Sequence, residues 1–201
     1  MFFNTQKKLS EEQLFTGCVK GDRKVCGTLY REWAPYMKAV CKRYVANSEI
    51  AEDIMHEAFI KVYEGVGKIQ WKGDGTFKAW VVRVMINACI DYIKSENNRN
   101  QHRIEDIFDI AETDDDIEED ISLLGIVKQK GITRDDLMEI LETLPESTRL
   151  VFNLYAIEQL KHKEIAELLG IAEEASRTRL KRARLQLKEK LAIKCNYRHK
   201  I

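Results

Sequence analysis

A basic stretch near the carboxyl end of the chain contains side chains that can bind nucleic acid. At about 100° per residue, one narrow arc of a helix contains Ser176, Leu180, Ala183, Leu187 and Leu191. The cations of this stretch largely face away from that arc. Arginine can read guanine edges in a major groove, and cations gain affinity by releasing phosphate counterions. A charge run is also typical of a solvated helix face, so this stretch alone leaves both interpretations open. The candidate duplex-binding residues are Arg177, Thr178, Lys181, Arg182 and Arg184.

The residues that precede this stretch favour DNA binding. The run from Glu164 to Gly170 reads EIAELLG, in which Ala166 lets two helices approach closely and Gly170 supplies a left-handed turn residue. Helix, glycine turn and helix together form the helix-turn-helix arrangement. We therefore predict a helix-turn-helix whose second helix carries the basic face.

A second group joins aromatic side chains with cations between residues 71 and 94. Such a mixture suits an unstacked single strand, because stacking on an aromatic ring is worth about 1–3 kcal/mol per base. A core role is the alternative for the aromatic rings. We expect Trp80, in register with Val84, to pack inside, and Trp71, in a loop with two glycines, to be exposed. The candidate residues are Trp71, Lys72, Lys78, Arg83 and Asn87.

A third group lies on the polar side of a helix predicted over residues 50–66. The apolar stripe of that helix is expected to be core. Taken alone, the polar side is only a solvated face. Its members are Glu52, Asp53, His56, Glu57 and Lys61.

The elements that must position these groups are predicted to be helices. Two prolines and ten glycines in 201 residues leave few breaks. Ser10, Asn47 and Thr133 can cap helices, and Gly21-Asp22 can end one helix and begin the next. Pro35 is expected in the first turn of a separate third helix.

The predicted fold class is all-α, with two small helical domains joined by an acidic linker. We place a helical domain at residues 1–103, the linker at 104–132, and the helix-turn-helix domain at 133–201. The linker contains the run IEDIFDIAETDDDIEED, and its density of like charge disfavours a packed core.

The net charge of zero conceals an uneven distribution along the chain. Residues 1–105 hold 17 basic and 13 acidic side chains, residues 106–142 hold 3 and 13, and residues 143–201 hold 13 and 7. The net charges of the three blocks are therefore +4, −10 and +6. Two basic blocks around an acidic one are a hint of a polyanion partner.

Enzymatic, metal-binding and membrane functions find little support in the sequence. The pair His56-Glu57 lacks a second histidine at metalloprotease spacing, and no phosphate loop or nucleophile elbow occurs. Five scattered cysteines without zinc spacing favour reduced thiols in a cytosolic protein, and the four isolated histidines are expected at the surface. No apolar run is long enough to cross a membrane, and the first residues do not read as a signal peptide. We predict no cofactor and no metal.

Taken in order, these motifs resemble the extracytoplasmic-function branch of the bacterial sigma factors. Residues 10–100 resemble the conserved region 2 of that family, and residues 133–193 resemble region 4. The matching runs of region 2 are GD at 21–22, AEDIMHEAFIKVYEG at 51–65 and FKAWVxRVxxNxxxDY at 77–92. Those of region 4 are LPESTRxVF at 144–152, EIAELLG at 164–170 and RTRLKRAR at 177–184.

The resemblance implies a non-enzymatic, dissociable subunit of RNA polymerase in the cytoplasm. The polar side of the 51–65 helix would dock on a coiled coil of the β′ subunit, and the acidic linker would thread the polymerase's nucleic-acid and RNA-exit path. The 71–76 loop and the helix after it would hold the minus-ten element, with a flipped base in the loop and Asn87 as a base reader. The last helix would read the minus-thirty-five element as duplex DNA. An anti-sigma factor is a common partner in the family.

Some positions depart from the family pattern. The family usually has a serine or threonine cap where Lys161 stands, and a missing cap costs about 1 kcal/mol. It often has serine or proline at Ala172, and Gly-Thr-Val where Glu174-Ala175-Ser176 stand. Glu173 and Glu174 also repel phosphate. These departures bear on the strength and sequence of minus-thirty-five recognition more than on the fold.

Two other classes remain open at this point. A helix-turn-helix regulator would bind DNA alone, and it usually needs a dimer interface. A helical protein–protein adaptor would leave both basic faces solvated and would not bind DNA. A sigma factor should bind promoters well only together with core polymerase.

Overall fold

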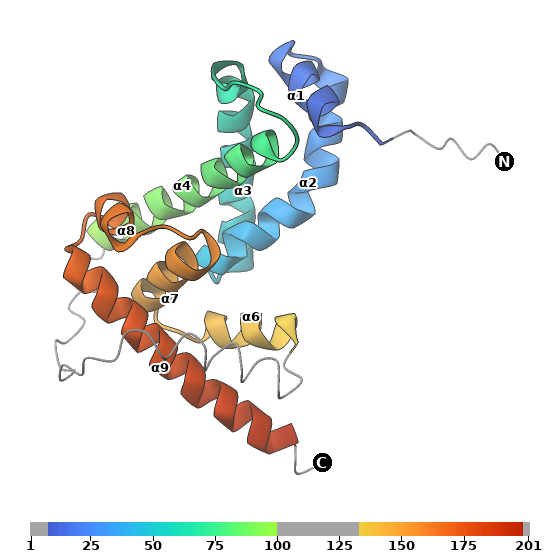
Figure 1. The fold of residues 1–201 in the computed structure, drawn as a ribbon. Coiled ribbons are helices and arrows are strands. Elements are labelled where there is room, and N and C mark those ends of the chain that lie inside the picture. Colours follow the sequence, from blue (N-terminus) through green and yellow to red (C-terminus); the bar gives the residue numbers. More distant parts are fainter. Residues whose placement is uncertain (1–7, 100–132, 199–201) are drawn as a thin grey trace. The chain divides into compact units, whose positions relative to one another are not determined.

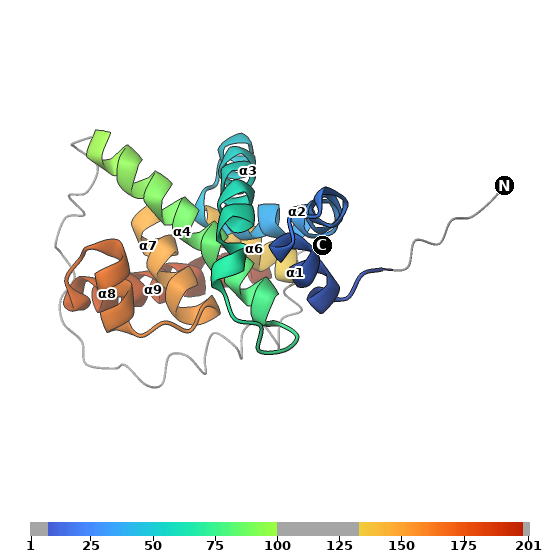
Figure 2. The same ribbon diagram turned by 90° about the horizontal axis from the view of Figure 1, so that it is seen from above.

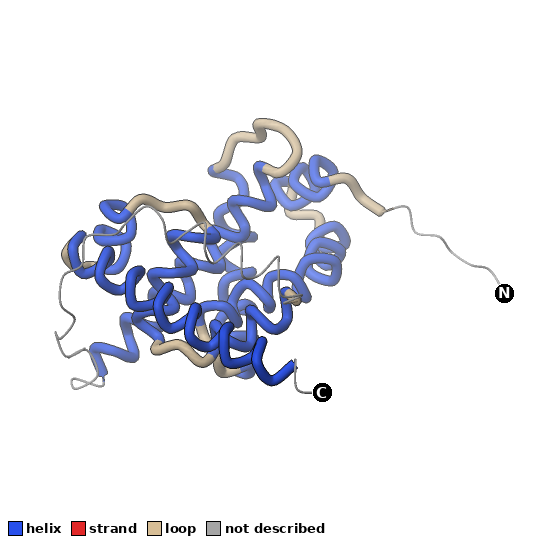
Figure 3. The backbone as a smooth tube through the Cα atoms, turned by 60° about the horizontal axis from the view of Figure 1, so that its bottom comes forward, coloured by secondary structure: helices blue, strands red, loops and turns tan. Residues whose placement is uncertain are grey.

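The computed structural model describes residues 8–99 and 133–198. Across these residues every regular element is helical (Figure 3), so the all-helical prediction is confirmed. The chain divides into two compact units, Met1–Glu96 and Asn97–Ile201. The predicted linker at 104–132 lies outside the described residues.

Helix α2 is the central element of the first unit, since both α1 and α3 pack against it (Figures 1 and 2). The predicted caps are confirmed: Ser10 forms a capping box with Gln13, and Asp22 and Asn47 each accept two backbone N–H groups. The elements are α1 (Glu11–Val19), α2 (Arg23–Tyr44), α3 (Ser48–Gly65), a 3₁₀ turn (Val66–Lys68) and α4 (Thr76–Arg99).

Pro35 lies inside α2 and does not begin a new helix, so that prediction is wrong. The proline ring has no N–H to donate to the carbonyl of Arg31, and an internal proline costs a helix about 3 kcal/mol or more. Apolar residues on both sides of the proline continue one buried face, from Leu29 through Met37 to Val40. We attribute the persistence of α2 to this burial, which a separate third helix would interrupt.

The second unit is organised around its last helix, because α6, α7 and α8 all pack against α9. Lys194 of α9 ties that helix to α6, with its Nζ 3.0 Å from Asp136 Oδ1 and 2.5 Å from Glu139 Oε2. These carboxylates, Glu139 foremost, raise the pKa of Lys194. The elements are α6 (Arg134–Glu142), α7 (Glu146–Phe152), a π-helical turn (Asn153–Ile157), α8 (His162–Leu169) and α9 (Glu173–Arg198).

Four cysteines lie among side chains that the structure describes, and all four are free thiols. Cys18, Cys41 and Cys89 are buried, as expected of small core residues, and Cys26 is half-buried. Cys18 Sγ lies 3.6 Å from Cys26 Sγ between α1 and α2. Burial raises the pKa of Cys18 to about 12, so this thiol is a poor nucleophile.

The contact between α1 and α2 depends on a glycine. A Cβ atom added at Gly17 would lie 2.5 Å from Val25 Cγ1, so only glycine allows the two helices this approach. A Cβ atom added at Gly27, within α2, would have open space around it, with no heavy atom within 4 Å.

We predict opposite effects of alanine at these two glycines. Gly17→Ala should lower the free energy of unfolding by about 1–3 kcal/mol, because the methyl group overpacks the α1–α2 contact. Gly27→Ala should raise it by about 0.5–1 kcal/mol, because alanine loses less backbone entropy in a helix. Urea unfolding followed by circular dichroism measures both. Equal effects of the two substitutions would contradict the tight contact.

Candidate nucleic-acid interface

The predicted helix-turn-helix consists of α8, a turn at residues 170–172 and α9. Gly170 adopts the left-handed conformation with a φ of 70°, and its N–H donates to the carbonyl of Ala166 at 2.8 Å. Lys161 stands at the start of α8 without a side-chain acceptor. Its own N–H donates to Glu164 Oε2 at 2.8 Å, so half of a capping box is retained.

The apolar arc of α9 is buried as predicted, and Ser176 on that arc has a partner. Ser176 is fully buried, and its hydroxyl lies 2.9 Å from Nδ1 of His162 in α8. The ring of His162 stacks on Tyr155 with the ring centroids 4.7 Å apart. His162 is therefore half-buried between helices, which corrects the expectation of a surface residue. The polar pair joins α8 to α9 at the position where the family often has valine.

The cations of α9 differ in how far they are exposed. Arg177 and Thr178 are exposed, and Lys181 and Arg182 are partly exposed. Arg177 pairs with Glu173, Nη2 to Oε1, at 2.6 Å. Glu173 therefore holds a neighbouring cation in addition to placing a negative charge at the start of α9.

Arg184 does not share the exposure of the other cations. Its side chain is only 9% exposed, and its guanidinium carbon lies 5.6 Å from the centroid of the Tyr155 ring. At about 100° per residue Arg184 falls about 20° beyond Leu191 at the edge of the apolar arc, so the helical periodicity already carried this signal. We interpret Arg184 as a packing residue within the second unit and remove it from the candidate duplex surface.

The loop before α4 is packed more closely than its glycines suggested. Trp71 is half-buried, with its ring stacked on Phe15 of α1 at 5.4 Å between centroids and 24° between planes. The expectation of an exposed Trp71 is therefore wrong. Phe77 is fully buried, and Trp80 is half-buried against Gly65 and Phe77.

The polar candidates around α4 are exposed. Lys72 lies in the loop, and Arg83 and Asn87 lie one turn apart on α4. Lys78 is also exposed, and its ammonium group lies 4.5 Å from the centroid of the Tyr36 ring. The structure thus brings four of the five residues of this group to the surface of the first unit.

A residue that the sequence reasoning missed holds the amino-terminal end of α4. Glu11 of α1 accepts the N–H of Gly75 at 2.9 Å through Oε2 and the N–H of Lys78 at 2.9 Å through Oε1. Gly73 and Gly75 have φ values of 111° and 89°, a conformation that side chains rarely adopt. No sequence signal pointed to Glu11, because more than sixty residues separate it from its partners.

Two of the five polar candidates on α3 are bonded to α2, and all of the five except Glu52 are exposed. Glu52 pairs with Lys38 of α2 at 2.5 Å, and this hydrogen bond lowers the pKa of Glu52. His56 Nε2 lies 2.9 Å from the Tyr30 hydroxyl. Asp53, Glu57 and Lys61 are exposed.

Ile60 is the second residue that sequence reasoning missed. Its side chain is 58% exposed on the same side of α3. At about 100° per residue, Asp53, Glu57, Ile60 and Glu64 fall within about 60° of one another. An apolar side chain out of phase with the buried stripe was the signal that could have identified it.

The described residues lack both a metal-binding cluster and a membrane-spanning helix. They contain no cluster of three or more side chains that could hold a metal ion. Within the same residues no helix is both long enough and apolar enough to cross a membrane.

Comparison with known proteins assigns the chain to a family. Residues 29–99 match the family Sigma-70 region 2, and residues 134–187 match Sigma-70, region 4. The ECF RNA polymerase sigma-E factor of Escherichia coli (strain K12) is 24% identical over 190 residues, which cover 92% of this chain and 96% of that protein. The chain belongs to the extracytoplasmic-function (ECF) sigma factors.

Two further proteins are similar to this chain. The ECF RNA polymerase sigma factor SigE of Mycolicibacterium smegmatis is 30% identical over 167 residues, covering 82% of this chain and 60% of that protein. Among solved structures, the sigma factor RpoE of Bartonella quintana in complex with the anti-sigma factor NepR is 17% identical, with a TM-score of 0.46 over 82% of this chain and 97% of that one.

The general function of the chain follows from its membership of the ECF sigma factors. The chain is a sigma factor that directs transcription initiation by RNA polymerase, and it is a non-enzymatic subunit. DNA binding belongs to the helix-turn-helix of region 4, which here comprises α8 and α9.

Proposed function

We propose that this ECF sigma factor binds core RNA polymerase in the cytoplasm through its first unit and brings two DNA-binding surfaces to a promoter. Residues 1–103 would serve polymerase docking and the minus-ten element, residues 104–132 would connect the domains, and residues 133–201 would read the minus-thirty-five element. The observation that carries the proposal is the order of the two family regions, each of which presents an exposed polar surface.

The proposed polymerase contact is the exposed side of α3. Asp53, Glu57 and Glu64 place three carboxylates around Ile60. A desolvated apolar side chain surrounded by charges is a common arrangement at a protein interface, where the apolar centre contributes affinity and the charges contribute orientation. We expect a basic partner surface, in line with the β′ coiled coil that the family resemblance implies, and further contacts to the β subunit.

The anchored residues Glu52 and His56 have a different part in this contact. Each is bonded to α2, so these two side chains position α3. Because Glu52 and His56 are engaged in this way, we assign most of the polymerase affinity to Asp53, Glu57 and Lys61, together with Ile60.

The proposed minus-ten surface combines the 71–76 loop with α4. Trp71, which is half-buried, would stack on a base of the single strand, and the exposed cations would contact its phosphates. Asn87 would read a base of the non-template strand. The remaining members of this surface are Lys72, Lys78 and Arg83.

The proposed minus-thirty-five surface is the exposed face of α9. Thr178, Lys181 and Arg182 would approach base edges and phosphates in the major groove, and Arg177 would join them after exchanging Glu173 for a phosphate. An anti-sigma factor is a further candidate partner, and the family resemblance is what supports it.

The first experiment maps transcript starts on genomic DNA after core polymerase is mixed with the purified chain. We expect starts that share a pair of upstream motifs, because two surfaces read two elements. The chain alone should give no footprint at these promoters. Transcript starts without a shared pair of upstream motifs would contradict the proposal. A footprint by the chain alone would favour a helix-turn-helix regulator.

Charge reversal on α3 tests the polymerase contact. Glu57→Lys should weaken binding of core polymerase by about tenfold or more, because like charges across an interface repel. A titration of core polymerase with a fluorescently labelled chain measures the affinity. Glu12→Lys, an equal charge change at an exposed position of α1, is the control and should bind as the wild type does. Equal affinity of both variants would remove α3 from the interface.

Two arginines of α9 should respond differently to alanine. Arg182→Ala should weaken a minus-thirty-five-dependent promoter by about 1–3 kcal/mol and relax base preference there, if the side chain makes a bidentate base contact. Arg184→Ala should instead lower the stability of the second unit, because its guanidinium packs on Tyr155. Promoter binding across a set of single-base variants, with thermal unfolding beside it, separates the two effects. Relaxed base preference in Arg184→Ala would restore that residue to the DNA surface.

A further inference from the structure

Helix α1 makes four contacts with the segment proposed to hold the minus-ten strand. Glu11 accepts two backbone N–H groups at the start of α4, from Gly75 and Lys78. Phe15 stacks on Trp71 and meets Phe77 edge-on, with centroids 5.5 Å apart. Both residues lie on one helix, so the segment from Trp71 to Lys78 is held from one side by α1.

Glu11 supplies what the local sequence lacks. The first N–H groups of a helix have no partner inside the helix, and a side chain at the cap position usually accepts them. The residue before α4 is Gly75, which has no side chain. A carboxylate at this end is favoured twice, because it accepts both hydrogen bonds and opposes the positive end of the helix dipole.

Phe15 orients the indole ring of Trp71. The two glycines with positive φ give the loop its turn but contribute no side-chain packing of their own. The planes of Phe15 and Trp71 are within 24° of each other, so the contact covers one face of the indole and limits its rotation. Trp71 as a whole residue remains partly exposed, as stacking of a base on its indole requires.

We infer that Glu11 and Phe15 are positioning residues for single-strand capture, acting through the Trp71–Lys78 segment. Ordering a loop on binding costs affinity, and a loop that is already held in its binding conformation avoids that cost. Neither side chain needs to touch the DNA. This inference rests on the proposed minus-ten surface and adds α1 to it.

The test uses holoenzyme assembled from core polymerase and the full chain, with a promoter taken from the start-site mapping. One probe is a fork whose non-template minus-ten strand is single-stranded, and the other is a duplex with only the minus-thirty-five element. Phe15→Leu and Glu11→Ala should each weaken fork binding by about three- to tenfold. Binding of the duplex should not change.

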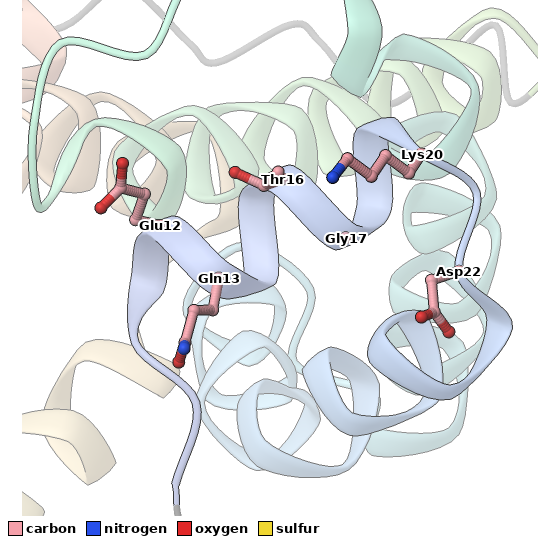
Figure 4. Close-up of a pocket in the computed structure, with 6 residues that line it drawn as sticks. All are labelled: Glu12, Gln13, Thr16, Gly17, Lys20 and Asp22. Atoms are coloured by element: carbon pink, nitrogen blue, oxygen red, sulfur yellow. The ribbon is translucent and has the colours of Figure 1, made fainter.

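Conservative and matched variants separate positioning from general stability. Phe15→Tyr should bind the fork as the wild type does, and Glu11→Gln should fall between wild type and Glu11→Ala, because its amide offers one acceptor oxygen instead of two. Glu12→Ala removes the same charge one residue along α1, where Glu12 lines a surface pocket with Gln13 and Thr16 (Figure 4). This control should leave fork binding unchanged.

A double-mutant cycle with Trp71 gives a readout that a loss of stability would not produce. If Phe15 acts through the indole, Phe15→Leu should cause no further loss of fork binding in a chain that carries Trp71→Ala. Additive losses, or an equal loss on fork and duplex, would overturn the inference. Tighter fork binding by Glu11→Gln would also overturn it, since Glu11 would then repel strand phosphates.

These outcomes are distinct from a failure of the proposed function. In that case the wild-type holoenzyme itself would bind the fork no better than a fork with a scrambled minus-ten strand. The inference about α1 is tested once the wild-type holoenzyme prefers the fork over the scrambled fork. The differences in fork binding among the α1 variants then decide it.

Discussion

Each functional helix in this protein presents one face because it buries the other. On α9, the buried arc from Ser176 to Leu191 packs against α6, α7 and α8. That burial determines which cations can reach a ligand: Arg182 is partly exposed, whereas Arg184 is covered beside Tyr155. The same constraint on α3 turns its carboxylates and Ile60 outward. The hydrophobic effect therefore acts indirectly on recognition, by fixing the rotation of each helix about its axis.

Two polar contacts join different helices, one within each unit. The hydroxyl of Ser176, at a fully buried position, is paired with the ring of His162. The first N–H groups of α4 are bonded to the carboxylate of Glu11. A buried hydroxyl without a partner would cost about 1–3 kcal/mol, so the pair of Ser176 and His162 also favours the contact between α8 and α9. In both units these pairs lie beside the surface that would contact nucleic acid.

Much of the local structure could be predicted from the sequence, and the errors have identifiable causes. The caps at Ser10, Asp22 and Asn47 were correct because a cap depends on residues two or three positions apart. The prediction that Pro35 begins a helix was wrong because local propensity places proline at a helix start, whereas burial along α2 keeps that helix continuous. The prediction that Trp71 is exposed was wrong because flanking glycines indicate a loop but do not indicate which side chains pack against it.

The sequence by itself determined the helical fold, the family and the sets of candidate residues, because helical periodicity and capping act within a few positions of the chain. Only the tertiary structure decided which members of each set are exposed. Glu11 lies sixty-four residues before Gly75, and Phe15 lies far from Trp71, so no local pattern links them. Contacts of that kind come from the way α1 and α2 pack, where Gly17 permits the close approach to Val25.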